Sequence, residues 1–187
     1  HWFIECMERG GRIVVIAPEY GAPSTKADYW IPIRPQTDAA FWLGVTRIML
    51  DNRWYDDKFV KEFTDFPLLV RTDNLERLRA DQVFRGYKPG LTKEGASFNL
   101  QGLSDEQYGK LGDRVVWDVN KNQPAAVTRD DVGARLTGKG IDPALDGTWK
   151  VKLTDGSEVE VTTLWSMYKV HLKDYDIDTV AEITHSP

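Results

Sequence analysis

The chain has 187 residues, of which 41% are hydrophobic and 28% charged, a composition typical of a globular protein rather than a disordered one. Its formal net charge is −5 and it contains no run of basic residues, which argues against a nucleic-acid-binding surface. The single cysteine, Cys6, excludes an internal disulfide and a multi-cysteine metal site built from this chain alone. No run approaches the roughly 20 apolar residues that span a bilayer.

Both ends of the chain have helical patterns. Residues 1–9 have the apolar spacing of the second half of an amphipathic helix, and the glycines at 10 and 11 are a stop signal. Residues 179–187 break off as another helix finishes. Because the chain also starts with histidine rather than methionine, we expect an internal fragment of a longer protein.

Two short strands and a helix are predicted next. Residues 12–17 are a β-branched run bounded by glycine and proline, which predicts a strand buried on both faces, as in a parallel sheet. Residues 29–33 predict a second strand, and Pro32 within it indicates an edge or a strand end. From Asp38 to Leu50 the chain is apolar on nearly every face, which predicts a helix of the kind that is buried in a large protein.

The middle of the chain gives weaker signals. Asp56 or Asp57 is expected to cap a short helix, and residues 68–70 are expected to form a strand. From there to residue 103 charges and glycines alternate without a sustained period, so we expect an extended excursion over a surface. Residues 104–107 have capping-box spacing and predict a brief helix.

A strand, a turn and another short helix follow. Residues 112–118 predict the strand and residues 120–122 the turn. The capping-box spacing returns at residues 128–131. With Val132 and Leu136 on one face and a glycine at 138 as the stop, it predicts a helix that begins at this box.

The clearest local structure is a β-hairpin over residues 148–163. A three-residue loop at 154–156 puts a glycine at its left-handed position. This register opposes Lys152 with Glu158, Lys150 with Glu160, Val151 with Val159 and Trp149 with Val161. A two-residue loop would mix charged and apolar partners, so the longer loop is predicted. With one solvated and one packed face, the hairpin is expected to be structural.

Two loops carry candidate binding residues. Glu19 follows the first strand, where a carboxylate can accept hydrogen bonds from ribose hydroxyls or a guanine N–H edge, and Gly21 leaves room for close approach. The alternative is that Glu19 is an exposed acidic residue of the loop with no binding role. At Gln36, Thr37 and Asp38 a strand turns into the helix. One interpretation is that Thr37 or Asp38 serves only as the N-cap of the helix. The other is that Asp38 also accepts hydrogen bonds from a guanine, and the two roles are compatible.

The other polar residues form no catalytic set. His171 and His185 are far apart and have no partner at metal-ligand spacing. Carboxylate pairs such as Asp130 with Asp131 stand where helix caps and solvated turns are expected. No Gly-x-Ser-x-Gly, P-loop or Gly-x-Gly-x-x-Gly pattern occurs. We therefore assign no catalytic residue and no metal ligand to this chain.

Three segments carry a family resemblance: GRIVVIAPEY at residues 11–20, WIPI at 30–33 and QTDAA at 36–40. With them the chain resembles the molybdenum oxidoreductases that bind bis(molybdopterin guanine dinucleotide). Within that superfamily it is most similar to the catalytic alpha subunits of nitrite oxidoreductases, relatives of respiratory nitrate reductases. The resemblance covers the whole chain, and its later parts carry the subfamily assignment.

The resemblance implies that the two loops hold the guanosine ends of the cofactor. The implied cofactor-binding residues are Ala17, Pro18, Glu19, Tyr20, Gly21, Gln36, Thr37 and Asp38. Many relatives have Asp-Pro-Arg where this chain has residues 17–19, and Gly-Thr-Asp where it has Gln36. Asp38 is therefore the residue on which the resemblance bears most directly.

The resemblance also implies a fold and its segments. The fold class is α/β, as part of a Rossmann-like parallel-sheet domain with an appended β-hairpin and short helices. Residues 1–67 form the α/β cofactor-binding segment, and residues 68–147 an irregular excursion with short helices and a strand. Residues 148–187 form the hairpin and the helices that return to the α/β body.

In the full-length enzyme the resemblance implies nitrite oxidation to nitrate by oxygen-atom transfer. The ligands of molybdenum and of a [4Fe–4S] cluster are expected upstream of residue 1. An iron–sulfur beta subunit and a membrane-anchoring subunit are the expected partners, at the cytoplasmic face of the inner membrane or in the periplasm. A respiratory nitrate reductase is the alternative within the class. A non-catalytic nucleotide-binding or subunit-contact module is the alternative outside it.

Overall fold

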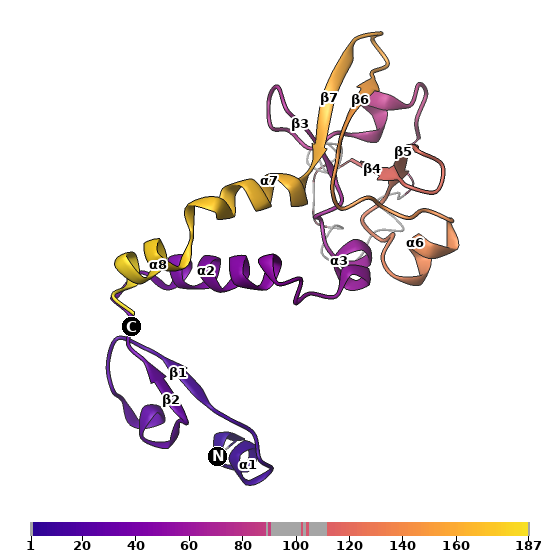
Figure 1. Ribbon diagram of the computed structural model, residues 1–187. Coiled ribbons are helices and arrows are strands. Elements are labelled where there is room, and N and C mark those ends of the chain that lie inside the picture. Colours follow the sequence, from indigo (N-terminus) through magenta and orange to yellow (C-terminus); the bar gives the residue numbers. More distant parts are fainter. Residues whose placement is uncertain (1, 89, 91–101, 103, 105–111, 187) are drawn as a thin grey trace. The chain divides into compact units, whose positions relative to one another are not determined.

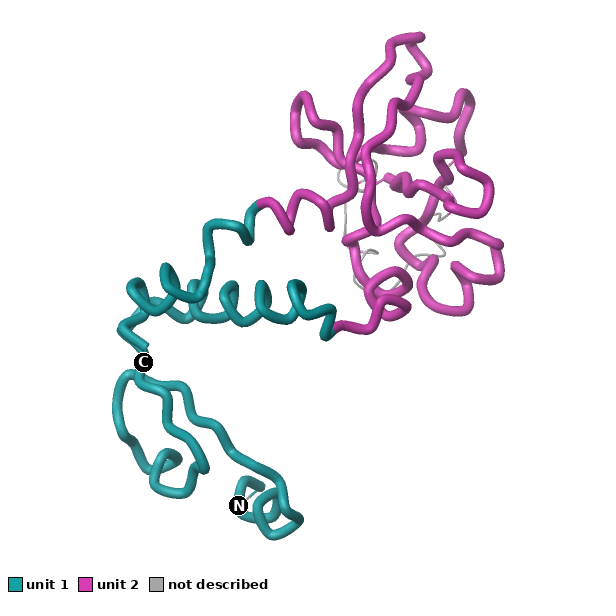
Figure 2. Tube along the Cα trace, in the orientation of Figure 1, with its two compact units in different colours: residues 1–54, 171–187 teal, residues 55–170 magenta. Residues whose placement is uncertain are grey.

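The computed structural model describes residues 2–88, 90, 102, 104 and 112–186. The chain forms two compact units, one of residues 1–54 with 171–187 and one of residues 55–170 (Figures 1 and 2). The predicted segment boundaries at 67 and 147 stay a prediction.

The described part of the first unit contains two short parallel strands, three α-helices and two 3-10 helices. Its elements are α1 (Trp2–Glu8), β1 (Val14–Ile16), η1 (Ala22–Lys26), β2 (Tyr29–Ile31), α2 (Asp38–Asp51), η4 (Leu172–Asp174) and α8 (Ile177–Thr184). The predicted helix at the start is confirmed as α1, which ends where the Gly11 N–H donates to the Cys6 carbonyl at 2.9 Å. Both predicted strands are confirmed, and Pro32 directly follows the second.

The strands of this unit are parallel, but the predicted burial of the first was wrong. Val15 of β1 pairs with Trp30 of β2, and the connection between them contains the 3-10 helix η1 rather than a packed α-helix. Val14 is 51% exposed, and β2 is the one strand that pairs with β1 among the described residues. The α/β class is confirmed, whereas the described strands form no Rossmann-like parallel sheet, since the other two sheets are antiparallel.

Helix α2 packs along α8 and η4. Gly44 faces Val180, and a Cβ built at Gly44 would lie 2.8 Å from a Val180 methyl carbon, so glycine permits the close approach. Arg47 donates from Nη1 to the Leu172 carbonyl at 3.2 Å. The predicted α2 is confirmed, while its burial in a larger protein stays a prediction: within this segment Gly44 is the one buried residue of the helix, and Trp42 is 54% exposed. Apolar composition identified the helix without identifying what covers it.

The second unit is built on antiparallel strands. Its elements are α3 (Asp57–Phe63), β3 (Leu69–Arg71), α4 (Ala80–Val83), β4 (Arg114–Asp118), β5 (Gln123–Val127), α6 (Ala134–Gly138), β6 (Thr148–Lys152), β7 (Glu158–Thr163) and α7 (Leu164–His171). Strands β3, β7 and β6 form one sheet in that order, and β4 with β5 forms a second (Figure 1). A cluster of apolar side chains from both sheets makes the core, including Leu69, Val115, Val151 and Val161.

The predicted hairpin is confirmed in its register. Lys152 pairs with Glu158, and Val151 with Val159. Leu153 N–H donates to the Ser157 carbonyl at 2.8 Å, which leaves three residues in the loop, and Gly156 has a φ of 91°. The valines are buried and the charged partners exposed, so opposite charges and apolar pairs occupy separate faces.

The predicted cap of α3 is also confirmed. Asp56 is its N-cap, and the Asp56 carboxylate accepts the Phe59 N–H at 3.0 Å.

Three expectations for the middle of the chain need correction. The predicted surface excursion contains Leu78 and Ala80, which are both fully buried, because their backbones pair with Leu69 and Asp113. Strand β5 was missed, since Pro124 is uncommon in a strand. Helix α6 begins at Ala134 rather than at the 128–131 box, which forms a turn. The predicted helix at 104–107 lies outside the described residues apart from Ser104.

Candidate functional site

The two predicted binding loops follow the carboxyl ends of two parallel strands. Residues 17–21 follow β1, and residues 32–38 connect β2 to α2. The Ala17 N–H donates to the Ile31 carbonyl at 3.2 Å, so the pairing of β1 and β2 extends to the start of the first loop. Because the strands run in the same direction, both loops leave the same edge of the pair, where α/β proteins bind ligands.

An indole fixes the first loop. Trp30 donates from Nε1 to the Ala17 carbonyl at 3.2 Å, and the Tyr20 ring packs edge-on against Trp30 with 5.2 Å between ring centroids. The Gly21 N–H donates back to the Glu19 carbonyl at 3.1 Å and tightens the turn. Pro18, Glu19 and Tyr20 are exposed. Within the described part of the chain the Glu19 carboxylate has no hydrogen-bond or ion-pair partner, so its oxygens are available to a ligand.

The second loop turns sharply before α2. Gln36 has a φ of 68°, a left-handed conformation that is uncommon outside glycine. The Thr37 hydroxyl donates to the Arg34 carbonyl at 2.6 Å. Thr37 occupies the N-cap position, as one alternative predicted, yet it makes no side-chain capping bond to the helix.

Asp38 is the first residue of α2 and is exposed. Its carboxylate has no hydrogen-bond or ion-pair partner among the residues that the structure describes. The partial positive charge at the start of a 14-residue helix favours a carboxylate at this position. An ionised carboxylate offers only acceptors, so Asp38 suits a ligand edge that presents N–H or O–H donors.

Two residues of this region were missed from the sequence. Trp30 was expected only as part of a strand, because an indole bond to a loop 13 residues away leaves no local signal. Ser24, in η1, is 3% exposed and its hydroxyl has no partner among the described residues. The contact of Trp30 with the first loop could not be found without knowing that β1 and β2 are neighbours.

The Trp30 indole gives a first testable prediction. Trp30→Phe keeps an aromatic ring beside Tyr20 but removes the donor to the Ala17 carbonyl, so it should cost about 1 kcal/mol of local stability. We expect faster hydrogen exchange in residues 17–21 with the rest of the first unit unchanged. Trp42→Phe is the matched control, since the Trp42 indole is 54% exposed. Equal exchange in the two variants would contradict the positioning role of Trp30.

The described residues do not include a metal centre. No group of three or more His, Cys, Asp or Glu side chains among them could hold a metal ion. The assignment of no metal ligand to this chain stays a prediction. Among the described helices, none is both long and apolar enough to cross a membrane.

Comparison with known proteins defines a class. No protein-family model matches the sequence. Over almost its whole length, however, the chain is similar to alpha subunits of oxidoreductases. This confirms the coarser prediction, a similarity to catalytic alpha subunits of the molybdopterin oxidoreductase class, and leaves nitrite oxidoreductase undistinguished from its relatives.

Three relatives represent the similarity. Perchlorate reductase subunit alpha of Dechloromonas aromatica is 30% identical over 100% of this chain and 20% of its own length. Dimethylsulfide dehydrogenase subunit alpha of Rhodovulum sulfidophilum is 27% identical over 98% of this chain and 18% of its own. Respiratory nitrate reductase subunit alpha of Haloferax mediterranei is 29% identical over 98% of this chain and 17% of its own length. The chain therefore spans about a fifth of the length of these relatives.

Proposed function

We propose that this chain is a segment of the catalytic subunit of a molybdenum oxidoreductase and holds the guanosine part of a bis(molybdopterin guanine dinucleotide) cofactor. The two loops that follow β1 and β2 would form the contacts. The relatives named above are reductases and dehydrogenases, which supports the class of reaction.

A single observation carries this proposal. Two loops follow two parallel strands at the same edge of the pair. Their exposed carboxylates, Glu19 and Asp38, have no hydrogen-bond or ion-pair partner among the described residues. Residues in this position on α/β proteins contact nucleotides through backbone and acidic groups. The strained Gln36 conformation is consistent with a functional loop, because such conformations cluster at ligand sites.

The donor edge of guanine fits these residues. Guanine presents an N1–H and an amino group side by side, and the two oxygens of the Asp38 carboxylate can accept one hydrogen bond from each. Glu19 would accept from ribose hydroxyls, and Gly21 would allow the backbone close to the nucleotide. The cofactor would supply two-electron redox chemistry when bound, and this segment would bind and orient it.

Asp38 gives the test of this proposal. Asp38→Asn in the full-length subunit keeps the shape of the side chain but replaces one acceptor oxygen by a donor. We expect molybdenum and guanine content per polypeptide to fall several-fold, because a charged hydrogen bond contributes about 1.5–3 kcal/mol. Asp38→Ala should lower both further and also weaken the start of α2.

Asp51→Asn is the matched control. Asp51 is at the opposite end of the same helix, where its exposed carboxylate is 3.5 Å from Arg47, so its loss should leave cofactor content unchanged. Full molybdenum and guanine content in Asp38→Asn and Asp38→Ala would overturn the guanine-binding role.

Within the class, we propose oxidation of nitrite to nitrate. The reaction takes an oxygen atom from water and releases two protons and two electrons. Respiratory nitrate reduction is the reverse reaction, and the similarity to the Haloferax nitrate reductase subunit supports it as the second candidate. Turnover of the intact complex with nitrite and an electron acceptor, compared with nitrate and a reduced dye, tests the direction.

The full-length protein is proposed to work with an iron–sulfur beta subunit and a membrane-anchoring subunit at the cytoplasmic face of the inner membrane. The subunit would also carry a [4Fe–4S] cluster on residues upstream of this segment. If the parent gene encodes no cysteine cluster upstream of this segment, the proposal that the protein is a molybdenum oxidoreductase is contradicted. Such a gene would favour a non-catalytic nucleotide-binding or subunit-contact module instead.

A further inference from the structure

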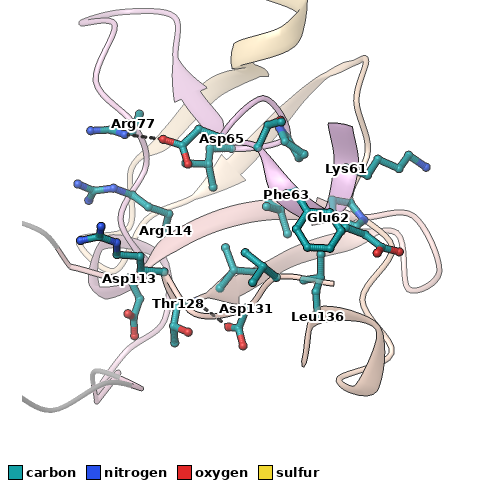
Figure 3. A pocket seen from close by; sticks show the side chains of 18 of the residues that line it. Lys61, Glu62, Phe63, Asp65, Arg77, Asp113, Arg114, Thr128, Asp131 and Leu136 are labelled. Atoms are coloured by element: carbon teal, nitrogen blue, oxygen red, sulfur yellow. Dashed lines mark hydrogen bonds and ion pairs between the residues drawn. The ribbon is translucent and has the colours of Figure 1, made fainter. Parts of the chain in front are cut away.

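The second unit contains a pocket that is independent of the loops on β1 and β2. Its volume is about 490 Å³, within the range of small-molecule sites, and all its lining residues belong to the second unit (Figure 3). Its floor is apolar and includes Leu68, Val116, Val127 and Leu136. Val116, Val127 and Leu136 are buried members of one apolar cluster, so the floor is part of the packed body of this unit.

Two arginines stand at one end of this pocket. Figure 3 shows Arg77 and Arg114 extending in the same direction, while Phe63, Glu62 and Lys61 lie toward the other end. Arg114 is the first residue of β4 and is half-buried. Among the described residues its guanidinium has no hydrogen-bond or ion-pair partner. Arg77 reaches Asp65 at 3.3 Å, but both side chains are largely exposed, so this pair contributes little.

The charge of Arg114 is poorly compensated. Burial lowers the pKa of Arg114 and repulsion from Arg77 and Arg79 lowers it further, while attraction by Asp65 and Asp81 offsets only part of this decrease. A guanidinium nevertheless stays protonated in proteins, so a half-buried positive charge persists here. An anion placed against Arg114 would restore the interaction that burial removes.

The carboxylates in the pocket wall are engaged elsewhere. Asp113 accepts hydrogen bonds from the Tyr87 hydroxyl at 2.6 Å and from the Gly90 N–H at 2.7 Å. Asp131 accepts from Lys139 at 2.6 Å and from the Thr128 N–H at 2.7 Å. The other two lining carboxylates are Glu62, which pairs with Lys58 at 3.9 Å, and Asp65, which pairs with Arg77. None of the four carboxylates forms a hydrogen bond or ion pair with Arg114, so an external anion can bind its guanidinium.

We propose that this pocket binds a small organic acid. Its carboxylate would lie against the guanidinium groups of Arg114 and Arg77, where two N–H donors of one arginine can meet both oxygens. Its apolar body would cover the floor formed by Val116, Val127 and Leu136. An inorganic anion would leave this floor uncovered, and a neutral apolar molecule would leave the charge of Arg114 uncompensated.

The test uses 4-phenylbutanoate as the probe on the full-length subunit, with binding measured by calorimetry. Two comparison probes separate the contributions: 4-phenylbutan-1-ol has the same body without the charge, and inorganic phosphate has charge without the body. We expect the acid to bind at least tenfold more tightly than either. Arg114→Gln should weaken binding of the acid about tenfold or more, because it removes a charged hydrogen-bond donor.

Arg85→Gln is the matched control, since Arg85 is an exposed arginine of the same unit outside this pocket. A second variant, Val132→Phe, fills the pocket from a 44% exposed lining position and should abolish binding without touching an arginine. Absence of acid binding, equal binding of acid and alcohol, equal binding of acid and phosphate, or unchanged binding in both Arg114→Gln and Val132→Phe would each overturn the proposal. Thermal unfolding of each variant verifies that it is folded.

Discussion

Replacing Gly44 with valine is expected to separate α2 from α8 and to destabilise the first unit by about 2–3 kcal/mol, the usual cost of overpacking a tight contact. The reason is steric. A Cβ at Gly44 would lie 2.8 Å and 3.1 Å from the two methyl carbons of Val180, and valine adds two further carbons. Hydrogen exchange of residues 38–51 and 177–184 measures the effect where it occurs, and exchange in the second unit should not change.

A compensating substitution tests the same contact from the other side. Val180→Ala removes the methyl groups that a new side chain at Gly44 would meet, so Gly44→Ala with Val180→Ala should be more stable than the sum of the single changes predicts. Ala39→Val is the matched control on an exposed position of α2. Wild-type exchange in Gly44→Val would show that the two helices do not pack as described.

Local sequence signals predicted local structure well. The hairpin at residues 148–163 was predicted to its register, because a turn type and four cross-strand pairs all lie within 16 residues. Helix α2 was predicted from its apolar run, and the cap of α3 from an aspartate. The burial of α2 in a larger protein stays a prediction, because composition does not specify which surfaces meet the helix.

Long-range contacts account for what the sequence could not predict. Leu78 and Ala80 are buried because their backbones pair with Leu69 and with Asp113, residues up to 33 positions away, and no periodicity marks such pairs. The positions of the two candidate binding loops after two strands were predicted, but the bond from the Trp30 indole that fixes the first loop was not. The pocket of the second unit combines segments from residue 61 to residue 143, so it has no sequence signature.

Leu69→Ala is expected to be the most damaging single truncation in the second unit. Leu69 is fully buried on β3, packed in the apolar cluster with Val115, Val151 and Val161, and its carbonyl accepts the Leu78 N–H at 2.8 Å. Removing its branched end leaves a cavity that a core built from two sheets cannot close, at a cost of about 3 kcal/mol. For a unit of this size the melting temperature should fall by about 10 °C.

Leu75→Ala removes the same atoms from a side chain that is 67% exposed, in the turn that follows the same strand, and should change the melting temperature by about 1 °C or less. The comparison is informative because Leu69 lies in the predicted strand at residues 68–70, whereas Leu75 lies in the stretch beyond it that was predicted as a surface excursion. If β3 lay on the surface, the two truncations would have equal and small effects. A large loss confined to Leu69→Ala requires β3 to be part of the core, and the core in turn fixes β4 and the wall of the pocket that Arg114 lines.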